Sequence, residues 1–560
     1  MKTSPAGALR QLTRAKQEFS PESGGLKTEL LRVLDRGQLN SAPAVLELHE
    51  TLCFMRAYPG TAEVLAAVER MLARFERRSD LRRYRERLAD TGIAGTEIRF
   101  PFFAPTAAWL AQQWGAQLSI DWSSQKNIDK LERLLPMLGL YCETLGLDEF
   151  GFEVREWINR MKRPEETDAA FLLRRLADTP MTPRVRESLF EELDMTLCLK
   201  AGTDTPARTR EKYASSNTAL QSVPLHRGRP DLRQELGRAP KSVRRLPRKE
   251  AIKIVGLARS AMVTRARDLD AFAYADPNDV TLIDCGDGLQ ITLNSMIPER
   301  RFLLESNLGY MLFRNGVPVG YGTYTALFNS AEVAYSVFDT FRSGEAAWMY
   351  ARILAVARHV LGANAFTIDP YQLGEDNDDA IASGAWWFYQ KLGFRPRDRE
   401  LLRLMNRELR RMEAKPGYRS STATLKKLVT ANVFFQTGRP REDVLAVLPL
   451  ANIGLKVTGY LAKRFGGERA QGERVCAQEA GKLLGVRSFR SFSPGEKLVW
   501  QRWSPLVMCL PGVDCWPAAD RRALAALIKA KGGESEVDYV RRFDAHRRLR
   551  RALVDVAGAR

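Results

Sequence analysis

An asparagine–glycine pair between two strand-like runs most constrains how this chain of 560 residues can fold. Gly309–Arg314 and Val317–Ala326 are rich in apolar, aromatic and β-branched residues, which favour extended backbone. Asn315-Gly316 between them predicts a two-residue hairpin turn, because both residues tolerate a positive φ. Ala331–Phe338 is expected to return as a third strand after a polar turn. The middle of the chain is therefore predicted to contain an antiparallel sheet.

A glycine-containing turn follows the third strand and is expected to open a long helix. Apolar residues recur at helical spacing from Ala346 to Val360, and Gly362 ends the pattern. Ala365–Asp369 is expected to form one more strand, and a second helix to run through Ala385–Lys391. The first N–H groups of a helix have no intrahelical partner, and its dipole favours negative charge there. A strand, turn and helix in this order therefore suit a bound anion.

The end of the second helix carries the most specific run of residues in the chain. Phe388–Phe394 spells Phe-Tyr-Gln-Lys-Leu-Gly-Phe. Together with the order hairpin, strand, glycine turn, long helix, strand and helix, this run resembles the GNAT family of acyl-CoA N-acyltransferases. The resemblance extends from Arg259 to Pro396 and leaves both flanks unassigned. It implies an α/β (α+β) fold with a mixed sheet flanked by helices. It also implies that acetyl-CoA or another acyl-CoA is the co-substrate.

The resemblance also implies where acyl-CoA would bind. The backbone of the third strand is expected to pair with the pantetheine arm around Tyr335, Val337 and Phe338. Phe341 replaces the family's usual Gln or Arg, although Arg342 beside it could supply the charge, and Glu345 adds a negative charge to the turn. In the family, the amides of this turn hold the CoA pyrophosphate, and the matching positions here are Phe341, Arg342, Ser343, Gly344, Glu345 and Ala346.

Two side chains are candidates for proton transfer. Glu332, early on the third strand, is the candidate base that deprotonates the acceptor amine, and a solvent-facing strand residue is the alternative. Tyr389 matches the tyrosine that in the family protonates the departing CoA thiolate, and a core tyrosine is the alternative. The loop after the last strand holds Asp369, Tyr371, Glu375 and Asp376, which suit either a cationic acceptor or a solvated surface.

The rest of the chain is expected to form two helical regions and a linker around the GNAT-like domain. Residues 1–200 are predicted to be mainly helical, residues 201–250 to be a basic, proline- and arginine-rich linker, and residues 401–560 to be mainly helical again. The GNAT-like domain occupies residues 251–400 between them.

Cysteine and histidine content argues against a metal centre. The seven cysteines are scattered singly and only four histidines occur, so we expect neither a disulfide framework nor a metal site. No run approaches the length of a membrane-spanning helix, and the chain starts without the apolar middle of a secretory signal. A cytoplasmic protein is the expectation.

The chain is strongly basic, with 86 Lys and Arg against 67 Asp and Glu and a net charge of +19. Basic residues collect in 201–250 and in the last helix, with few aromatics between them, so nucleic acid is not favoured as a partner. The leading hypothesis is an enzyme that transfers an acyl group from acyl-CoA to an amine by direct attack. The alternative is a catalytically silent GNAT-like protein whose helical flanks bind a partner.

Overall fold

The computed structural model describes residues 4–214, 218–342 and 344–558, which form two compact units. Unit 1 comprises Met1–Pro224, Ile252–Tyr274 and Arg314–Pro318. Unit 2 comprises Leu225–Ala251, Ala275–Phe313 and Val319–Arg560. The division between the units therefore falls within helix α13 (Arg248–Val263), whose residues up to Ala251 belong to unit 2 and the rest to unit 1. The hairpin tip Arg314–Pro318 likewise belongs to unit 1, whereas the residues on either side of it belong to unit 2.

Unit 1 begins with a bundle of helices whose starts are encoded locally. The side chains of Ser4, Ser20, Ser41 and Thr61 each accept a hydrogen bond from a backbone N–H three residues on, which caps the helix that follows. Leucines, valines and Phe75 fill the core of the bundle. Its helices are α1 (Pro5–Ala15), α2 (Pro21–Arg36), α3 (Ala42–Ala57), α4 (Ala62–Ala73) and α5 (Ser79–Arg83).

The second half of unit 1 packs helices against a small sheet that the sequence pattern did not predict. Three strands of three residues each, β1 (Ile98–Phe100), β2 (Leu118–Ile120) and β3 (Leu197–Leu199), pair in the order β1-β3-β2. Strands this short are too brief for an alternating pattern to stand out. The helices are α6 (Ala104–Trp114), α7 (Ile128–Leu138), α8 (Thr144–Glu149), α9 (Val154–Met161), α10 (Asp168–Asp178), α11 (Pro183–Glu192) and α14 (Asp270–Ala273).

Unit 2 is built on a nine-stranded mixed sheet flanked by helices, as the sequence pattern predicted in outline. Strands β9 and β10 pair in parallel, whereas β8–β9 and β10–β12 pair antiparallel. The edge strand β4 and the inner strand β12 come from outside residues 251–400, so the sheet draws on the expected linker and the C-terminal region. In sheet order the strands are β11 (Arg395–Pro396), β12 (Val433–Gln436), β10 (Ala365–Ile368), β9 (Ser330–Val337), β8 (Val317–Leu327), β7 (Ser306–Arg314), β6 (Leu289–Met296), β5 (Ala275–Gly286) and β4 (Ser242–Arg245).

Two hairpin turns of the sheet have the same backbone geometry. Asn315 and Gly316, between β7 and β8, have φ angles of 51° and 78°, as the sequence predicted. Phe328 and Asn329, between β8 and β9, have φ angles of 51° and 55°, although a phenylalanine rarely adopts this conformation. Both turns therefore belong to the type that matches the twist of antiparallel strands.

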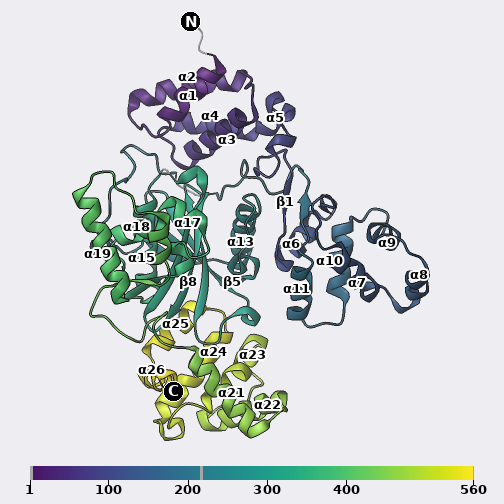
Figure 1. Cartoon of the computed structure of the whole chain (residues 1–560), viewed down its shortest axis with the longest axis vertical. Helices are drawn as coiled ribbons and strands as arrows, with labels where there is room; N and C mark the ends of the chain where they lie inside the picture. The colour runs from purple at the N-terminus through teal and green to yellow at the C-terminus, as the bar shows by residue number, and fades with distance from the viewer. Residues whose placement is uncertain (1–3, 215–217, 343, 559–560) are drawn as a thin grey trace. The chain divides into compact units, whose positions relative to one another are not determined.

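Helix α15 (Ala346–Val356) lies against one face of this sheet (Figure 1). The Tyr324 hydroxyl on β8 donates to the Ile353 carbonyl of α15 over 2.8 Å, which fixes the helix to the strand. The other helices of unit 2 are α12 (Leu232–Glu235), α16 (Pro370–Leu373), α17 (Asp378–Ser383), α18 (Ala385–Lys391), α19 (Arg399–Ala414), α20 (Thr422–Leu428), α21 (Ala451–Phe465), α22 (Arg469–Leu484), α23 (Pro494–Val507), α24 (Ala518–Gly532), α25 (Glu536–Ala545) and α26 (Arg547–Gly558).

Buried charges attach the C-terminal helices to the sheet of unit 2. The Arg301 guanidinium donates to the carbonyls of Lys531 and Gly533, and the Lys531 ammonium pairs with the Glu536 carboxylate at 2.9 Å. The Glu536 N–H donates to Asp279 of β5. Because isolated buried charges are costly, this set of partners holds α24 and α25 in one position.

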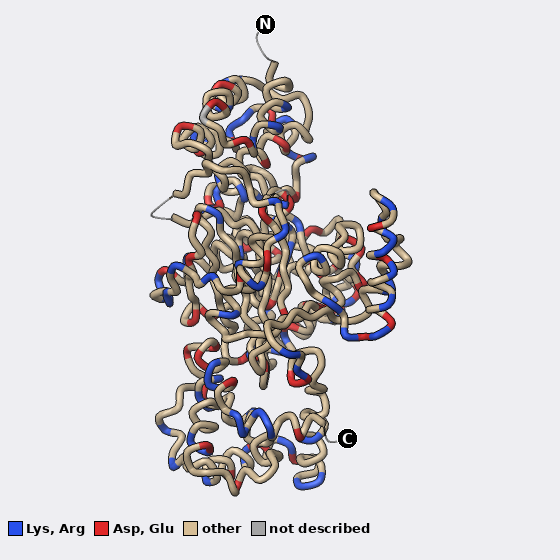
Figure 2. Tube along the Cα trace, turned by 90° about the vertical axis from the view of Figure 1, so that its left-hand side faces the viewer, with Lys and Arg blue, Asp and Glu red and all other residues tan. Residues whose placement is uncertain are grey.

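The basic residues are less concentrated than the sequence suggested. Lys and Arg occur along the whole trace (Figure 2). The last basic stretch forms two helices, α25 and α26, and Arg542, Arg548 and Arg550 in it pair with carboxylates. Among the described residues, no helix has the length and apolar character needed to span a membrane.

Candidate active site

Strands β9 and β10 part after three residue pairs, and this opening is the centre of the candidate site. Their parallel pairing ends at Thr367 opposite Glu332, and β10 itself ends at Ile368. Strand β9 continues to Val337, so residues 333–337 run on without a partner in β10. We use the word opening for this edge of β9, which has no strand partner among the described residues.

The backbone of β9 presents donors to this opening. Phe338 donates its N–H to the Val319 carbonyl of β8, so alternation along the strand directs the N–H groups of Tyr335 and Val337 to the opposite side. The Tyr335 N–H donates to the side-chain oxygen of Gln372 on α16 over 3.3 Å. A side chain thus holds one of the positions at which the sequence analysis expected a pantetheine arm.

Five tyrosines gather where α15 and α18 meet the sheet, and two of them have unusual hydroxyls. Tyr310, Tyr324 and Tyr335 donate to the carbonyls of Ala334, Ile353 and Ala346. The fully buried Tyr350 hydroxyl has no partner among the described residues. The structure gives the Tyr389 hydroxyl no hydrogen bond to the described residues either, and its ring lies 5.4 Å from that of Tyr350. Burial raises the pKa of both phenols, which therefore stay protonated at neutral pH.

A glycine makes the tyrosine contact with β9 possible. A Cβ atom at Gly322 of β8 would lie 2.0 Å from the Ala334 carbonyl oxygen and 2.3 Å from the Tyr310 hydroxyl. Only a residue without a side chain lets Tyr310 reach across β8 to Ala334. The glycine that the sequence placed inside this strand is therefore required by packing.

Glu332 lies on the other face of the sheet from Tyr335, because the two residues are three positions apart on one strand. Burial raises the pKa of its carboxyl to about 7, with smaller contributions from the nearby charges of Asp369 and Glu305. Its cross-strand neighbour Thr367 is fully buried, and the Thr367 hydroxyl has no hydrogen-bond partner among the described residues. A carboxyl that titrates near neutral pH is suited to accept a proton.

The turn before α15 differs in its details from the expected pyrophosphate cradle. Phe341 is buried, and Arg342 is exposed and pairs with Asp339 at 2.8 Å. The Gly344 N–H donates to the Phe341 carbonyl, so this amide is engaged within the turn. Ser343, the remaining expected contact, lies outside the described residues.

The start of α15 contains a buried carboxylate. Glu345 is 1% exposed, and its side chain accepts the N–H of His226 over 3.2 Å. The His226 ring stacks on Trp348 in the first turn of α15. The Ala346 carbonyl accepts the Tyr335 hydroxyl, which ties the helix start to β9. A segment of the expected linker therefore packs at the position where the sequence suggested an anion.

The structure brings the expected Tyr335 and Tyr389 together around Tyr350 and places Glu332 on the opposite face of the same strand. The sequence analysis missed Tyr350 as a functional candidate, because it counted this residue only as part of the buried stripe of the helix. It also missed Gln372 and Thr367, which have no motif of their own. Their importance depends on contacts between segments about 35 positions apart.

In the expected acceptor loop, Asp369 begins α16 by accepting the Tyr371 N–H, and Tyr371 is 55% exposed. Among the described residues, no group of three or more His, Cys, Asp or Glu side chains is placed to hold a metal ion. Searches against protein-family models, curated proteins and solved structures found no match to this chain.

Proposed function

We propose that unit 2 transfers an acyl group from an acyl-CoA to an amine. The observation that supports this proposal is the opening between β9 and β10, where backbone donors line one edge and two nearby phenols have no hydrogen-bond partner in the described part of the chain. A thioester with an extended amide-containing arm can pair with such an edge in the way that a peptide adds to a strand.

The fit to acyl-CoA is good at the strand and partial at the turn. The outward N–H of Val337 and the aromatic wall suit the pantetheine arm and the acyl group. The first amides of α15 suit a phosphate because they have no intrahelical partner. The buried carboxylate of Glu345 opposes a second negative charge at that place.

Glu332 would act as the base in this reaction. The amine attacks the thioester carbonyl carbon while its proton passes to the Glu332 carboxylate, directly or through a water molecule. A pKa of about 7 makes this carboxyl a useful acceptor at neutral pH, because it is partly ionised and still basic.

Tyr389 would act as the acid. As the carbon–sulfur bond breaks, the sulfur takes the electron pair, and the Tyr389 hydroxyl supplies the proton that gives the free thiol. Burial raises the pKa of this phenol and so keeps it protonated at neutral pH, and Tyr350 beside it is a second buried phenol that could supply a proton.

The test is calorimetric titration with acetyl-CoA, followed by chromatographic detection of free CoA in the presence of a panel of primary amines. We expect Tyr389→Phe to lower kcat by about 100-fold while leaving the acetyl-CoA Kd unchanged. Tyr460→Phe on α21 is the matched control and should leave both constants unchanged. Lack of acetyl-CoA binding at millimolar concentration would overturn the proposal.

A catalytically silent acyltransferase-like unit is the second candidate, and one observation favours it. Gln372 already accepts the Tyr335 N–H, so the strand edge is partly satisfied without a ligand. This candidate predicts that the chain binds acetyl-CoA weakly or not at all, and that removal of Gln372 does not change this.

A further inference from the structure

Helix α19 carries the most concentrated unpaired positive charge in unit 2. Residues 399–427 contain nine Lys and Arg against three Asp and Glu. One of the three acids, Glu408, is fully buried and accepts from Arg411, Tyr418 and Ser420. The outer surface of this segment therefore carries nine exposed Lys and Arg against two exposed acids, Glu400 and Glu413.

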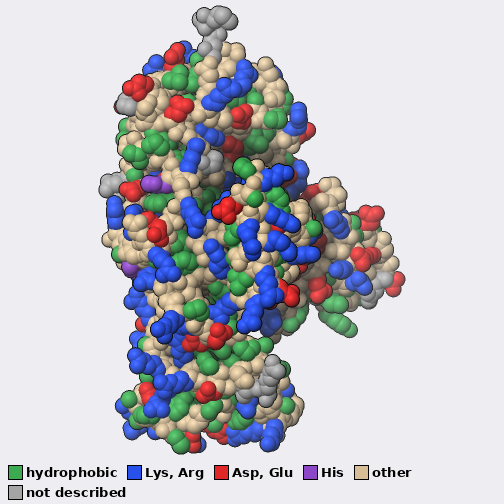
Figure 3. Space-filling model, turned by 60° about the vertical axis from the view of Figure 1, so that its left-hand side comes forward, with side chains coloured by type: hydrophobic (Ala, Val, Ile, Leu, Met, Phe, Trp, Pro, Cys, Tyr) green, Lys and Arg blue, Asp and Glu red, His purple; other side chains and the backbone are tan. Residues whose placement is uncertain are grey.

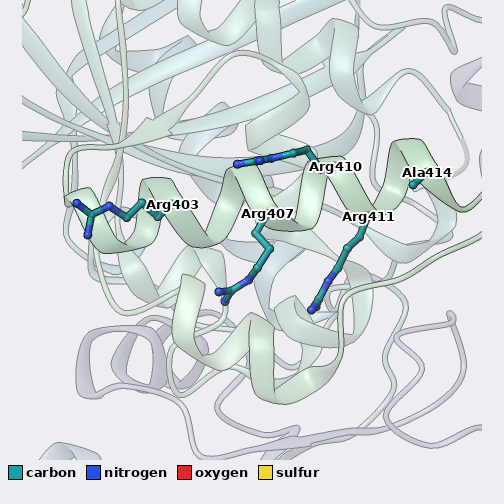
Figure 4. Close-up of a pocket in the computed structure, with 5 residues that line it drawn as sticks. All are labelled: Arg403, Arg407, Arg410, Arg411 and Ala414. Atoms are coloured by element: carbon teal, nitrogen blue, oxygen red, sulfur yellow. The ribbon is translucent and has the colours of Figure 1, made fainter.

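A hollow of about 480 Å³ runs along this helix, lined by Arg403, Arg407, Arg410, Arg411 and Ala414 (Figure 4). Arg407 and Arg411 point to the same side of α19, and Arg410 extends along it (Figure 4). Space-filling side chains show Lys and Arg gathered over the face that holds α19 (Figure 3). From Arg403 to Arg411 the row extends about 12 Å, at 1.5 Å per helical residue.

Three of these four guanidinium groups, those of Arg403, Arg407 and Arg410, have no carboxylate partner among the described residues. Of the four arginines, only Arg411 forms an ion pair with a described residue. By contrast, Arg244 in the 201–250 segment pairs with Glu250, and Arg548 and Arg550 of α26 pair with Asp520 and Asp443. The charge on α19 therefore stays available to a partner.

We propose that the row Arg403, Arg407, Arg410 and Arg411 binds the phosphate backbone of double-stranded DNA. Guanidinium groups bind phosphate oxygens through paired N–H donors, and arginine suits this role better than lysine. Ala414 is the only apolar residue of the lining, whereas a protein partner would require an apolar centre to its interface.

The lining also distinguishes among nucleic acids. It holds no aromatic side chain, so it offers no platform on which the bases of a single strand could stack. Its four arginines provide no acceptor for the proton of a 2′-hydroxyl, but they can donate to its oxygen, so a duplex RNA of equal length is the comparison that tests the choice of DNA. Contacts of this kind fix a duplex by charge and without regard to its sequence.

Fluorescence anisotropy with the full chain and a labelled 20-base-pair DNA duplex, from 50 to 200 mM salt, tests the proposal. The variant Arg403→Ala/Arg407→Ala/Arg410→Ala spares Arg411, which supports Glu408. We expect the slope of log K against log salt to become shallower by about 3, since each phosphate contact contributes about 0.9. The control Arg469→Ala/Arg474→Ala/Arg487→Ala removes the same charge from exposed positions in α22 and in the loop that follows it, and should change the slope by less than 1.

Three results would overturn the proposal. The first is a wild-type chain that does not bind the duplex at 50 mM salt. The second is an equal loss of affinity in the two triple variants, which would indicate general charge attraction. The third is tighter binding of a duplex RNA of equal length or of polyglutamate.

Two controls accompany the binding measurements. Circular dichroism melting of each variant checks that the fold is unchanged. Acetyl-CoA binding does not depend on α19, so measuring it separates the outcome of this test from the outcome of the acyltransferase proposal.

Discussion

The Tyr335 N–H donates to the side-chain oxygen of Gln372 over 3.3 Å, on the stretch of β9 that has left β10. This single bond closes part of the strand edge that an acyl-CoA would need. Gln372 lies on the short helix α16, which directly follows β10. The segment after β10 therefore supplies the acceptor for a backbone N–H of β9. If acyl-CoA binds as proposed, Gln372 is the side chain that would compete with it for the Tyr335 N–H.

Replacement of Gln372 should therefore favour ligand binding. Gln372→Ala releases the Tyr335 N–H, and we expect acetyl-CoA to bind about 3–10-fold more tightly, the worth of one hydrogen bond. Gln372→Glu keeps an acceptor at the same place and should not tighten binding. Calorimetric Kd values for the three proteins measure the effect, and an alanine variant with unchanged affinity would contradict a role for this edge.

The raised pKa of Glu332 predicts a specific pH dependence of stability. Burial favours the neutral form of the Glu332 carboxyl. The stability that this neutral carboxyl contributes to the fold is fully present below pH 4.5 and is lost as the pH rises through about 7. Between pH 4 and pH 8, the unfolding free energy of the wild type should thus fall by up to about 3 kcal/mol relative to that of Glu332→Gln. Urea unfolding of both proteins across this range gives the difference. The exposed Glu375→Gln is the control, and parallel curves for wild type and Glu332→Gln would refute the prediction.

Gly322 should tolerate no side chain. A Cβ atom there would meet the Ala334 carbonyl oxygen at 2.0 Å, so Gly322→Ala is expected to cost about 3 kcal/mol or more of unfolding free energy. In the control Gly454→Ala, within α21, the new Cβ has no neighbour within 4 Å and should stabilise the helix by about 0.5–1 kcal/mol. Denaturant unfolding compares the two, and a mild effect at Gly322 would show that β8 can shift.

Arg550 holds the strained turn that leads into β9. Its guanidinium donates to the Phe328 carbonyl, to the Asn329 side chain and to Asp443. We expect Arg550→Met to lower the unfolding free energy by about 2 kcal/mol, because a backbone carbonyl and a half-buried carboxylate lose a charged donor. Arg551→Met removes the same charge from an exposed neighbour and should change stability by less than about 0.5 kcal/mol. Thermal melting distinguishes them.

The local pattern was sufficient to predict the hairpin at Asn315-Gly316, the antiparallel strands on either side of it and the long helix from Ala346, whereas the mixed sheet with flanking helices was implied by the resemblance. The hairpin, its strands and this helix depend on residues close in sequence, such as positive-φ turn residues and apolar positions at helical spacing. The short strands β1, β2 and β3, the edge strand β4 and the inner strand β12 escaped the pattern. Strands of three or four residues are stabilised by their partners and hardly at all by their own sequence.

The candidate site shows the same division. The sequence by itself determined the order of strand, turn, helix, strand and helix, and with it the candidates Glu332 and Tyr389. Only the tertiary structure decided that Gln372 occupies part of the strand edge, that Glu345 is buried at the start of α15, and that Tyr350 has a hydroxyl without a partner among the described residues. Burial and hydrogen bonding join residues far apart in the chain, so the state of each of these groups depends on which segments pack together.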